Sequence, residues 1–212
     1  MTEPGSHEFR TSASRVAYDG AVIALRVDDV VMPGGRTAVR EVVEHYGAVA
    51  IVAVDDDDRI VFVEQYRHPV GARLLELPAG LLDEPGESPL EAAQRELVEE
   101  AGVTAATWHL LVDVAVSPGM TDESVRVFLA EGLEVTERPE AEHEEADMKV
   151  IRISLAEAVV KALRGEITNA TAVAGVLALS AARSDGTELR PAGAPWPNQP
   201  AALAQRRHGD GR

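Results

Sequence analysis

Three glutamates, Glu96, Glu99 and Glu100, stand three and four residues apart in one short segment of the chain. A helix would place all three on the same side, because residues three or four positions apart are neighbours on a helix surface. Like charges at this spacing repel each other, and the C-terminal turns of a helix disfavour anions. The pattern therefore favours a cradle for divalent cations, and carboxylate oxygens suit magnesium. The alternative is an acidic face exposed to solvent.

The segment around these glutamates carries the signals of a helix from Ser88 to Gly102. Ser88 stands at the N-cap, Pro89 at the first helical position, and Glu91 completes a capping box. Gly102 ends the helix. Its apolar residues are expected to face the core, on the side opposite the glutamates: Leu90, Leu97 and Ala101.

The spacing of residues around this helix resembles the Nudix box, the signature of the Nudix hydrolase family. From Glu87 to Val103 the match is complete: a glutamate, seven residues, then Arg-Glu-aliphatic-any-Glu-Glu-any-Gly-aliphatic. The departure lies in front of the helix, where six residues rather than five separate Gly80 from Glu87. The loop before the helix therefore carries an insertion of one residue.

Three further segments resemble the bacterial ADP-ribose pyrophosphatases within that family: Gln65-Tyr-Arg67, Glu76-Leu-Pro-Ala-Gly80 and Ser117-Pro-Gly119. The resemblance implies hydrolysis of the pyrophosphate of ADP-ribose to AMP and ribose 5-phosphate, with magnesium as cofactor or manganese in its place. Two alternatives stay open. One is another Nudix pyrophosphatase, acting on nucleotide sugars, dinucleotides or nucleoside triphosphates. The other is a sensor that binds ADP-ribose without cleaving it.

The resemblance also implies which residues would bind the metal. Glu96 and Glu100 would be direct ligands together with the backbone carbonyl of Ala79, and Glu99 would bind the metal directly or through water. Arg95 would pair with the acidic residues of the box and orient them, as residues around metal ligands do. The alternative for Arg95 is a surface ion pair that contributes little.

The reaction needs a nucleophilic water and a carboxylate that takes its proton or positions it. Members of the family often supply this group from a loop before the last strand, which here is the acidic segment 139–147. We expect Glu145 to be the base, with Glu144 second and Glu99 as a further catalytic residue. The alternative is that the segment is merely acidic and mobile.

Four residues are candidates for binding the substrate. Arg67 would grip a phosphate or the terminal ribose, because a forked guanidinium suits oxyanions. Glu76 stands in the second of the three resembling segments, and Gly119 would let the backbone approach the substrate closely. Met120 follows Gly119, and its alternative is packing in the core. The resemblance further implies a homodimer in which residues 21–45 exchange between subunits.

Composition restricts the class of protein. The 212 residues include 20 basic and 36 acidic side chains, a formal net charge of −16, which disfavours nucleic acids and anionic membranes as partners. An anionic substrate would also be repelled unless cations or arginines reverse the charge at the site. The chain has no cysteine, which excludes a cysteine nucleophile and is compatible with the reducing cytoplasm. We find no segment that reads as a signal peptide or membrane span.

Strands and helices mix without strict alternation, which predicts an α/β fold: a Nudix-type α/β/α sandwich with a mixed sheet, plus an N-terminal β-hairpin. Residues 21–31 and 37–45 flank a Pro-Gly-Gly turn and form that hairpin. Further elements are expected as strands at 48–54, 59–65, 108–116, 124–130 and 149–153, and as helices at 154–165 and 170–182. We expect a hairpin region at 1–46, the Nudix domain at 47–190 and a loosely ordered tail at 191–212.

Overall fold

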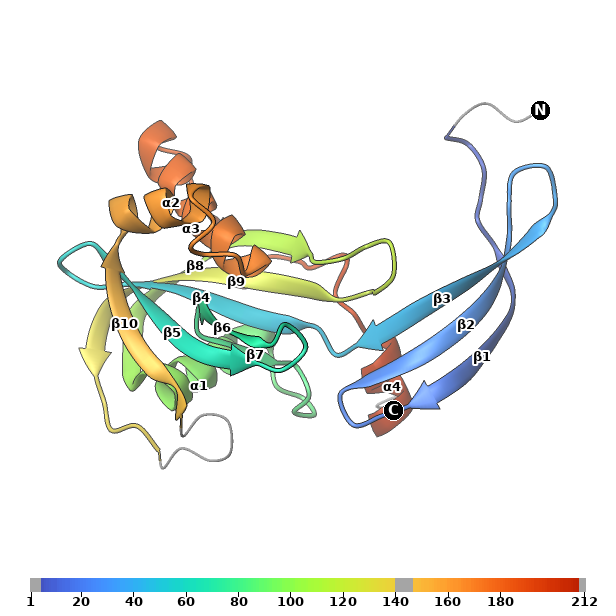
Figure 1. The fold of residues 1–212 in the computed structure, drawn as a ribbon, viewed down its shortest axis with the longest axis horizontal. Coiled ribbons are helices and arrows are strands. Elements are labelled where there is room, and N and C mark those ends of the chain that lie inside the picture. Colours follow the sequence, from blue (N-terminus) through green and yellow to red (C-terminus); the bar gives the residue numbers. More distant parts are fainter. Residues whose placement is uncertain (1–4, 140–146, 210–212) are drawn as a thin grey trace. The chain divides into compact units, whose positions relative to one another are not determined.

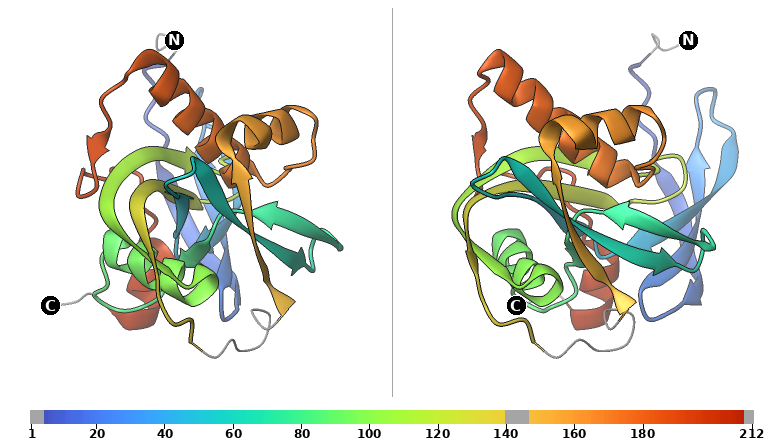
Figure 2. Two further views of the ribbon diagram at one scale, coloured as in Figure 1. Left: turned by 90° about the vertical axis from the view of Figure 1, so that its left-hand side faces the viewer. Right: turned by 60° about the vertical axis from the view of Figure 1, so that its left-hand side comes forward.

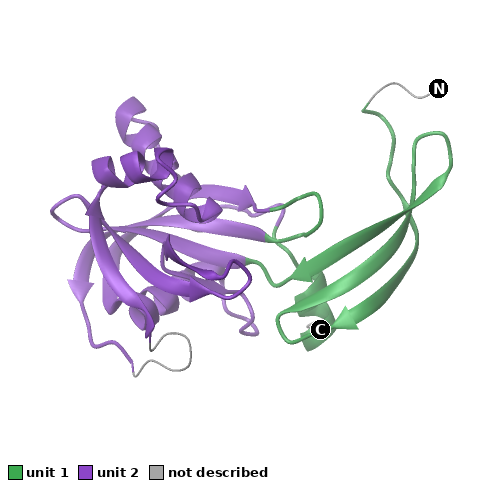
Figure 3. Cartoon of the chain, viewed as in Figure 1, with its two compact units in different colours: residues 1–47, 117–123, 199–212 green, residues 48–116, 124–198 purple. Residues whose placement is uncertain are grey.

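The computed structural model describes residues 5–139 and 147–209, and the chain divides into two compact units (Figure 3). Unit 1 comprises residues 1–47, 117–123 and 199–212, and unit 2 comprises residues 48–116 and 124–198. This division differs from the expected one in two places. The segment 117–123 and the end of the chain both belong to the N-terminal unit, so unit 1 is assembled from three separate stretches of sequence.

Unit 2 contains a mixed sheet with the strand order β10-β5-β4-β9-β8-β11 (Figure 1). Strands β4 and β9 are parallel and the other neighbours are antiparallel, while β6 pairs with β5 and β7 with β4. The strands are β4 (Ala48–Val54), β5 (Arg59–Arg67), β6 (Ala72–Glu76), β7 (Ala79–Leu81), β8 (Val103–Ala115), β9 (Ser124–Val135), β10 (Lys149–Ser154) and β11 (Arg190–Pro191). Strands β6, β7 and β11 were not predicted, and each is five residues or shorter.

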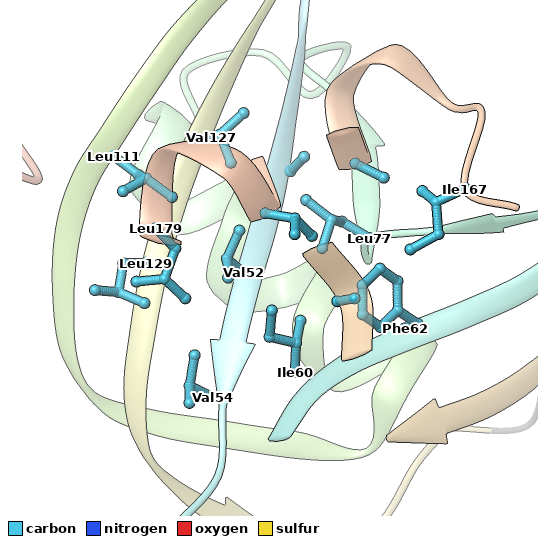
Figure 4. Packing of buried hydrophobic residues seen from close by; sticks show 14 of the residues in the cluster. Val52, Val54, Ile60, Phe62, Leu77, Leu111, Val127, Leu129, Ile167 and Leu179 are labelled. Atoms are coloured by element: carbon cyan, nitrogen blue, oxygen red, sulfur yellow. The ribbon is translucent and has the colours of Figure 1, made fainter. Parts of the chain in front are cut away.

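Three helices cover the two faces of this sheet (Figure 2). They are α1 (Pro89–Ala101), α2 (Leu155–Leu163) and α3 (Ala170–Asp185). Helix α1 packs on one face through Ala92, Ala93 and Leu97. Helices α2 and α3 pack on the other, where a larger apolar core includes Phe62 and Leu179 (Figure 4). The α/β/α sandwich with a mixed sheet is thereby confirmed. Among the described residues, no helix is both long and apolar enough to span a bilayer.

Local signals in the sequence account for the position of α1. The side chain of Ser88 accepts a hydrogen bond from the Glu91 N–H, and the Glu91 carboxylate accepts one from the Ser88 N–H. At the other end Gly102 adopts a left-handed conformation with φ 63°, which a residue with a side chain reaches only with strain. Both predicted ends of the helix are confirmed.

Unit 1 is built on a three-stranded antiparallel sheet of β1 (Thr11–Asp19), β2 (Ile23–Val31) and β3 (Thr37–His45). The predicted hairpin is confirmed as β2 and β3, whose turn contains Gly34 and Gly35 at positive φ. Strand β1 was not predicted; it is exposed along its whole length, so its sequence shows no buried face. The segment 117–123 joins unit 1 through the Val43 N–H, which donates to the Met120 carbonyl at 2.8 Å.

Residues 202–208 form a helix where we expected a loosely ordered tail. Helix α4 (Ala202–His208) buries Leu203 completely against Ala24 and Tyr46 of unit 1. Arg206 forms an ion pair with the fully buried Glu44. The expectation failed because this helix has one large apolar anchor and no N-terminal cap. Its order comes from contacts with distant residues, which leave no periodic pattern in the local sequence.

A glycine in α3 sets how closely that helix approaches the sheet. A Cβ at Gly175 would lie 2.9 Å from Leu77 Cδ1, 2.9 Å from Val52 Cγ2 and 3.3 Å from Val127 Cγ1. We therefore expect Gly175→Val to lower the free energy of unfolding by about 2 kcal/mol or more, through overpacking. Urea denaturation measures this. Leu177→Val, at an exposed position of the same helix, should change it by less than about 0.5 kcal/mol. Equal effects would contradict the packing argument.

Candidate active site

Helix α1 meets strand β7 at two successive residues of the strand. The Glu100 carboxylate accepts a hydrogen bond from the Ala79 N–H at 2.9 Å, and Glu100 is only 6% exposed. A Cβ on Gly80 would lie 1.9 Å from Glu96 Oε1 and 2.0 Å from Glu96 Cδ. The Glu96 carboxylate therefore occupies the space that a side chain at Gly80 would take. Both carboxylates are directed to the same strand.

The expectation that all three glutamates lie opposite the apolar side of α1 was wrong for Glu100. Glu100 follows the fully buried Leu97 by three residues, and positions three apart share a helix face. Its side chain is buried because β7 lies beside the apolar face and offers a backbone N–H to the carboxylate. Glu99, with 35% of its side chain exposed, is the most accessible of the three.

Arg95 links the glutamates, as predicted. Its Nη1 donates to Glu96 Oε1 at 2.6 Å and to Glu99 Oε2 at 2.9 Å. Its Nε and Nη2 donate to the two oxygens of Glu87, each at 2.9 Å. The hydrogen bonds with Glu87, and then with Glu96 and Glu99, raise the pKa of the Arg95 guanidinium, although burial acts against them. Arg95 is thus a fixed cation that orients three carboxylates.

The loop in front of α1 accommodates its extra residue without moving Glu87 away from the site. Gly86 has a φ of 83°, and the Glu87 N–H donates to the Glu84 carbonyl at 3.3 Å, so the chain makes a tight turn there. The two hydrogen bonds between Glu87 and Arg95 are formed after this turn. The departure from the Nudix box therefore changes the loop and preserves the role of its first glutamate.

The chemistry of this group fits a divalent cation. Three carboxylates, from Glu87, Glu96 and Glu99, surround one guanidinium, and the carboxylate of Glu100 is held by the Ala79 N–H; hard cations prefer such oxygen donors. The side-chain-free space at Gly80 is a second sign that Glu96 must approach the backbone. Over residues 5–139 and 147–209, no three acidic or imidazole groups converge on one cation position. Here Arg95 and the Ala79 N–H hold the carboxylates instead.

A second polar group lies on β5 and β6. Arg67 Nε and Nη2 donate to the Glu76 carboxylate, at distances down to 2.7 Å, and Gln65 Nε2 donates to Glu76 Oε2 at 3.2 Å. Glu76 is 2% exposed, whereas 40% of the Arg67 side chain is exposed. A buried carboxylate thus fixes a partly exposed guanidinium. The structure brings the two predicted substrate residues of unit 2 together.

Four other residues were predicted for the site: Gly119, Met120, Glu144 and Glu145. Gly119 and Met120 belong to unit 1, where Met120 is 57% exposed, so its alternative role as a core residue is wrong. Glu144 and Glu145, the expected bases, lie outside the described residues. The roles of all four stay predictions. Sequence reasoning assigned no role to Gln65 or Gly80; the signal available for Gly80 was its place as the first glycine of the box, ahead of a helix of carboxylates.

Comparisons with known proteins identify the family of this chain. The NUDIX domain family matches residues 37–174. The ADP-ribose pyrophosphatase of Mycobacterium tuberculosis is 54% identical over 201 residues, 95% of this chain and 97% of the relative. The ADP-ribose pyrophosphatase of Bacillus subtilis is 42% identical over 154 residues, 73% and 83% of the two chains. The crystal structure of an ADP compounds hydrolase superposes with a TM-score of 0.71 at 21% identity, covering 85% of this chain and 97% of that one.

The match to more than half of the chain, together with these relatives, shows that the protein belongs to the Nudix family and is a Nudix hydrolase. The solved structure, at its low identity, supports the fold alone. Nudix hydrolases use divalent metal cations, in agreement with the donor set on α1.

The close approach of Glu96 to Gly80 leads to a prediction. Gly80 has an ordinary φ, so Gly80→Ala meets no backbone strain, but its Cβ must displace the Glu96 carboxylate. We expect hydrolase turnover to fall by at least about tenfold, because small displacements of catalytic groups are costly. The free energy of unfolding should change by less than about 1 kcal/mol. Gly193→Ala, where a Cβ meets nothing within 4 Å, is the matched control and should keep full activity. Normal turnover in Gly80→Ala would refute the displacement.

Proposed function

We propose that this protein hydrolyses the pyrophosphate of ADP-ribose, giving AMP and ribose 5-phosphate. The observation that carries the proposal is the complete carboxylate group of α1 held against β7 by the Ala79 N–H and Gly80. The substrate is suggested by the relative that is 54% identical over nearly the whole chain and named for this activity. The arginine–glutamate pair on β5 and β6 suits a substrate with two phosphates.

Magnesium is the metal that we propose, with manganese as the alternative, because the ligands are carboxylate oxygens. Glu96 and Glu100 would hold it with the Ala79 carbonyl, and Glu99 would bind directly or through water. When bound, the metal lowers the pKa of a water molecule and offsets the charge of the phosphate oxygens. Hydrogen bonds from Arg95 hold the carboxylates of Glu96 and Glu99 in fixed positions.

The protein's own groups would complete the reaction. A carboxylate, which we propose to be Glu145 with Glu144 second, takes the proton of the attacking water. The water oxygen forms a bond to one phosphorus, and the bond between that phosphorus and the bridging oxygen breaks. Arg67, held by Glu76, would bind a phosphate or the terminal ribose. Gly119 and Met120 would contact the substrate from the loop of unit 1.

The proposal is tested by incubating the protein with ADP-ribose and magnesium in oxygen-18 water and identifying the products. We expect AMP and ribose 5-phosphate, with one of them labelled. Glu96→Gln should lower turnover by about a hundredfold or more with an unchanged fold, because it removes a charged ligand. Glu157→Gln, an exposed glutamate on α2 over the other face of the sheet, is the matched control. Unchanged activity in Glu96→Gln would remove the metal assignment.

Assays on the same protein distinguish two alternative functions. Faster hydrolysis of a nucleotide sugar, dinucleotide or nucleoside triphosphate in a substrate panel would assign a different Nudix pyrophosphatase activity. Tight binding of ADP-ribose by calorimetry, with no hydrolysis in magnesium, would indicate a sensor. The complete set of Glu96, Glu99 and Glu100 favours hydrolysis, because binding alone does not require all three.

We also propose that the protein is a homodimer of the cytoplasm. The strands of unit 1 and the residues next to them expose large apolar side chains: Phe9, Val16, Tyr18, Val22, Ile23 and Val39. Exposed apolar surface is a feature of protein interfaces when it gathers in one region. The lack of cysteine is compatible with a reducing compartment. A second copy of the chain is the partner that covers this surface in the proposal.

The dimer proposal predicts that charge on β1 prevents association. In Val16→Lys/Tyr18→Lys the two side chains, 43% and 60% exposed in the single chain, would place positive charge in the interface. We expect analytical ultracentrifugation to report a dimer for the wild type and a monomer for this variant. Val135→Lys, at the more exposed and isolated Val135 of unit 2, should remain a dimer. A wild-type monomer at micromolar concentration would refute the proposal.

A further inference from the structure

The last turn of α1 contains two glutamates and no basic residue. The C-terminal end of a helix carries a partial negative charge, which the carboxylates of Glu99 and Glu100 increase. The Glu99 carbonyl is also among the last four of the helix, which have no partner within it. Val103, whose N–H would be next in the helix, instead begins β8. This helix end therefore needs a cation from elsewhere in the fold.

Arg138 provides that cation from the segment after β9. Its Nε donates to the Glu99 carbonyl oxygen at 2.7 Å, although the two residues are 39 positions apart in sequence. A guanidinium stays charged at all physiological pH values, so the bond is charge-assisted. Arg138 Nη2 is buried and has no hydrogen-bond partner among the described residues. The guanidinium is thus partly shielded from water, which strengthens its attraction to the helix end.

Backbone contacts fix Arg138 over this helix end. The Thr136 N–H donates to the Gly102 carbonyl at 2.9 Å. A Cβ on Gly102 would lie 3.4 Å from Arg138 Cβ and 3.5 Å from the Thr136 carbonyl oxygen. Gly102 therefore ends the helix by its left-handed conformation, and the segment that carries Arg138 lies within van der Waals distance of this helix end.

We propose that Arg138 is a positioning residue for the cation site. It holds the last turn of α1, and with it the carboxylates of Glu99 and Glu100, in the arrangement that binds the metal. This inference rests on the proposed function, since it assumes that these carboxylates bind a divalent cation. The hydrogen bond of Arg138 goes to the backbone and not to a carboxylate, so Arg138 acts through the helix.

Two effects of Arg138 on the metal have opposite signs, which makes the proposal testable. As a nearby positive charge, the guanidinium repels a cation, and its removal would strengthen metal binding. As a cap, it preorganises the ligands, and its removal would weaken metal binding. The proposal states that the second effect is larger.

The experiment measures Mn²⁺ binding without substrate, by the electron paramagnetic resonance signal of the free ion. For Arg138→Met we expect the dissociation constant of Mn²⁺ to rise by about tenfold, as for other residues that orient metal ligands. At saturating metal the KM for ADP-ribose should be unchanged. Arg138→Lys, which keeps the charge and a donor, should recover most of the loss. Arg183→Met removes a partly exposed arginine paired with Asp58 and Glu131, and should bind Mn²⁺ as the wild type does.

Unchanged or tighter Mn²⁺ binding in Arg138→Met overturns the proposal, and so does an equal loss in Arg183→Met. Should Arg138→Met fail to fold, Arg138→Gln replaces it under the same two outcomes. Glu96→Gln separates this inference from the proposed function. If the wild type binds no Mn²⁺, or Glu96→Gln binds it equally well, the metal site itself is refuted. If the wild type binds Mn²⁺, Glu96→Gln binds it more weakly and Arg138→Met binds it as the wild type does, the metal site stands and the positioning role is refuted.

Discussion

Strand β7 has no side chain at Gly80, and the carboxylate of Glu96 fills the space that a Cβ would occupy. One residue earlier, the Ala79 N–H holds the buried carboxylate of Glu100. Burial of a carboxylate is costly unless a hydrogen-bond donor compensates it, and a short strand end beside a helix provides such a donor. The close contact between α1 and β7 fixes the carboxylates of Glu96 and Glu100 in the candidate active site. The sheet and core of unit 2 hold the helix and the strand together.

The contact between α1 and β7 gathers negative charge in a molecule that is already acidic. A chain with a net charge of −16 would repel a pyrophosphate, and four carboxylates at one helix increase that repulsion. Arg95 offsets part of it within the helix, and in the proposal Arg138 offsets part of it at the helix end. Both arginines are oriented by hydrogen bonds: Arg95 donates to the carboxylates of the box, and Arg138 donates to the Glu99 carbonyl. The remaining negative charge suits divalent cations, which in turn can bind phosphate oxygens.

The two units differ in how they are assembled from the sequence. Unit 2 is nearly continuous, and its sheet forms a core with helices on both faces. Unit 1 collects three stretches, and its interior contains ion pairs as well as apolar contacts: the buried Glu44 pairs with Arg26 and with Arg206. Burial raises the pKa of Asp122, which accepts a hydrogen bond from the His45 N–H in the same unit. Removing one partner of such a pair leaves a buried charge, so α4 is an integral part of unit 1.

Sequence alone determined what depends on neighbours along the chain. The capping box at Ser88 and the left-handed Gly102 act within one turn, so both ends of α1 were predictable, as were the hairpin of β2 and β3 and the spacing of Glu96, Glu99 and Glu100. Only the tertiary structure decided the burial of Glu100, the contact of Glu96 with Gly80, the order of α4 and the place of Arg138. Each of these joins residues far apart in sequence, and no local pattern encodes a partner that only folding brings near.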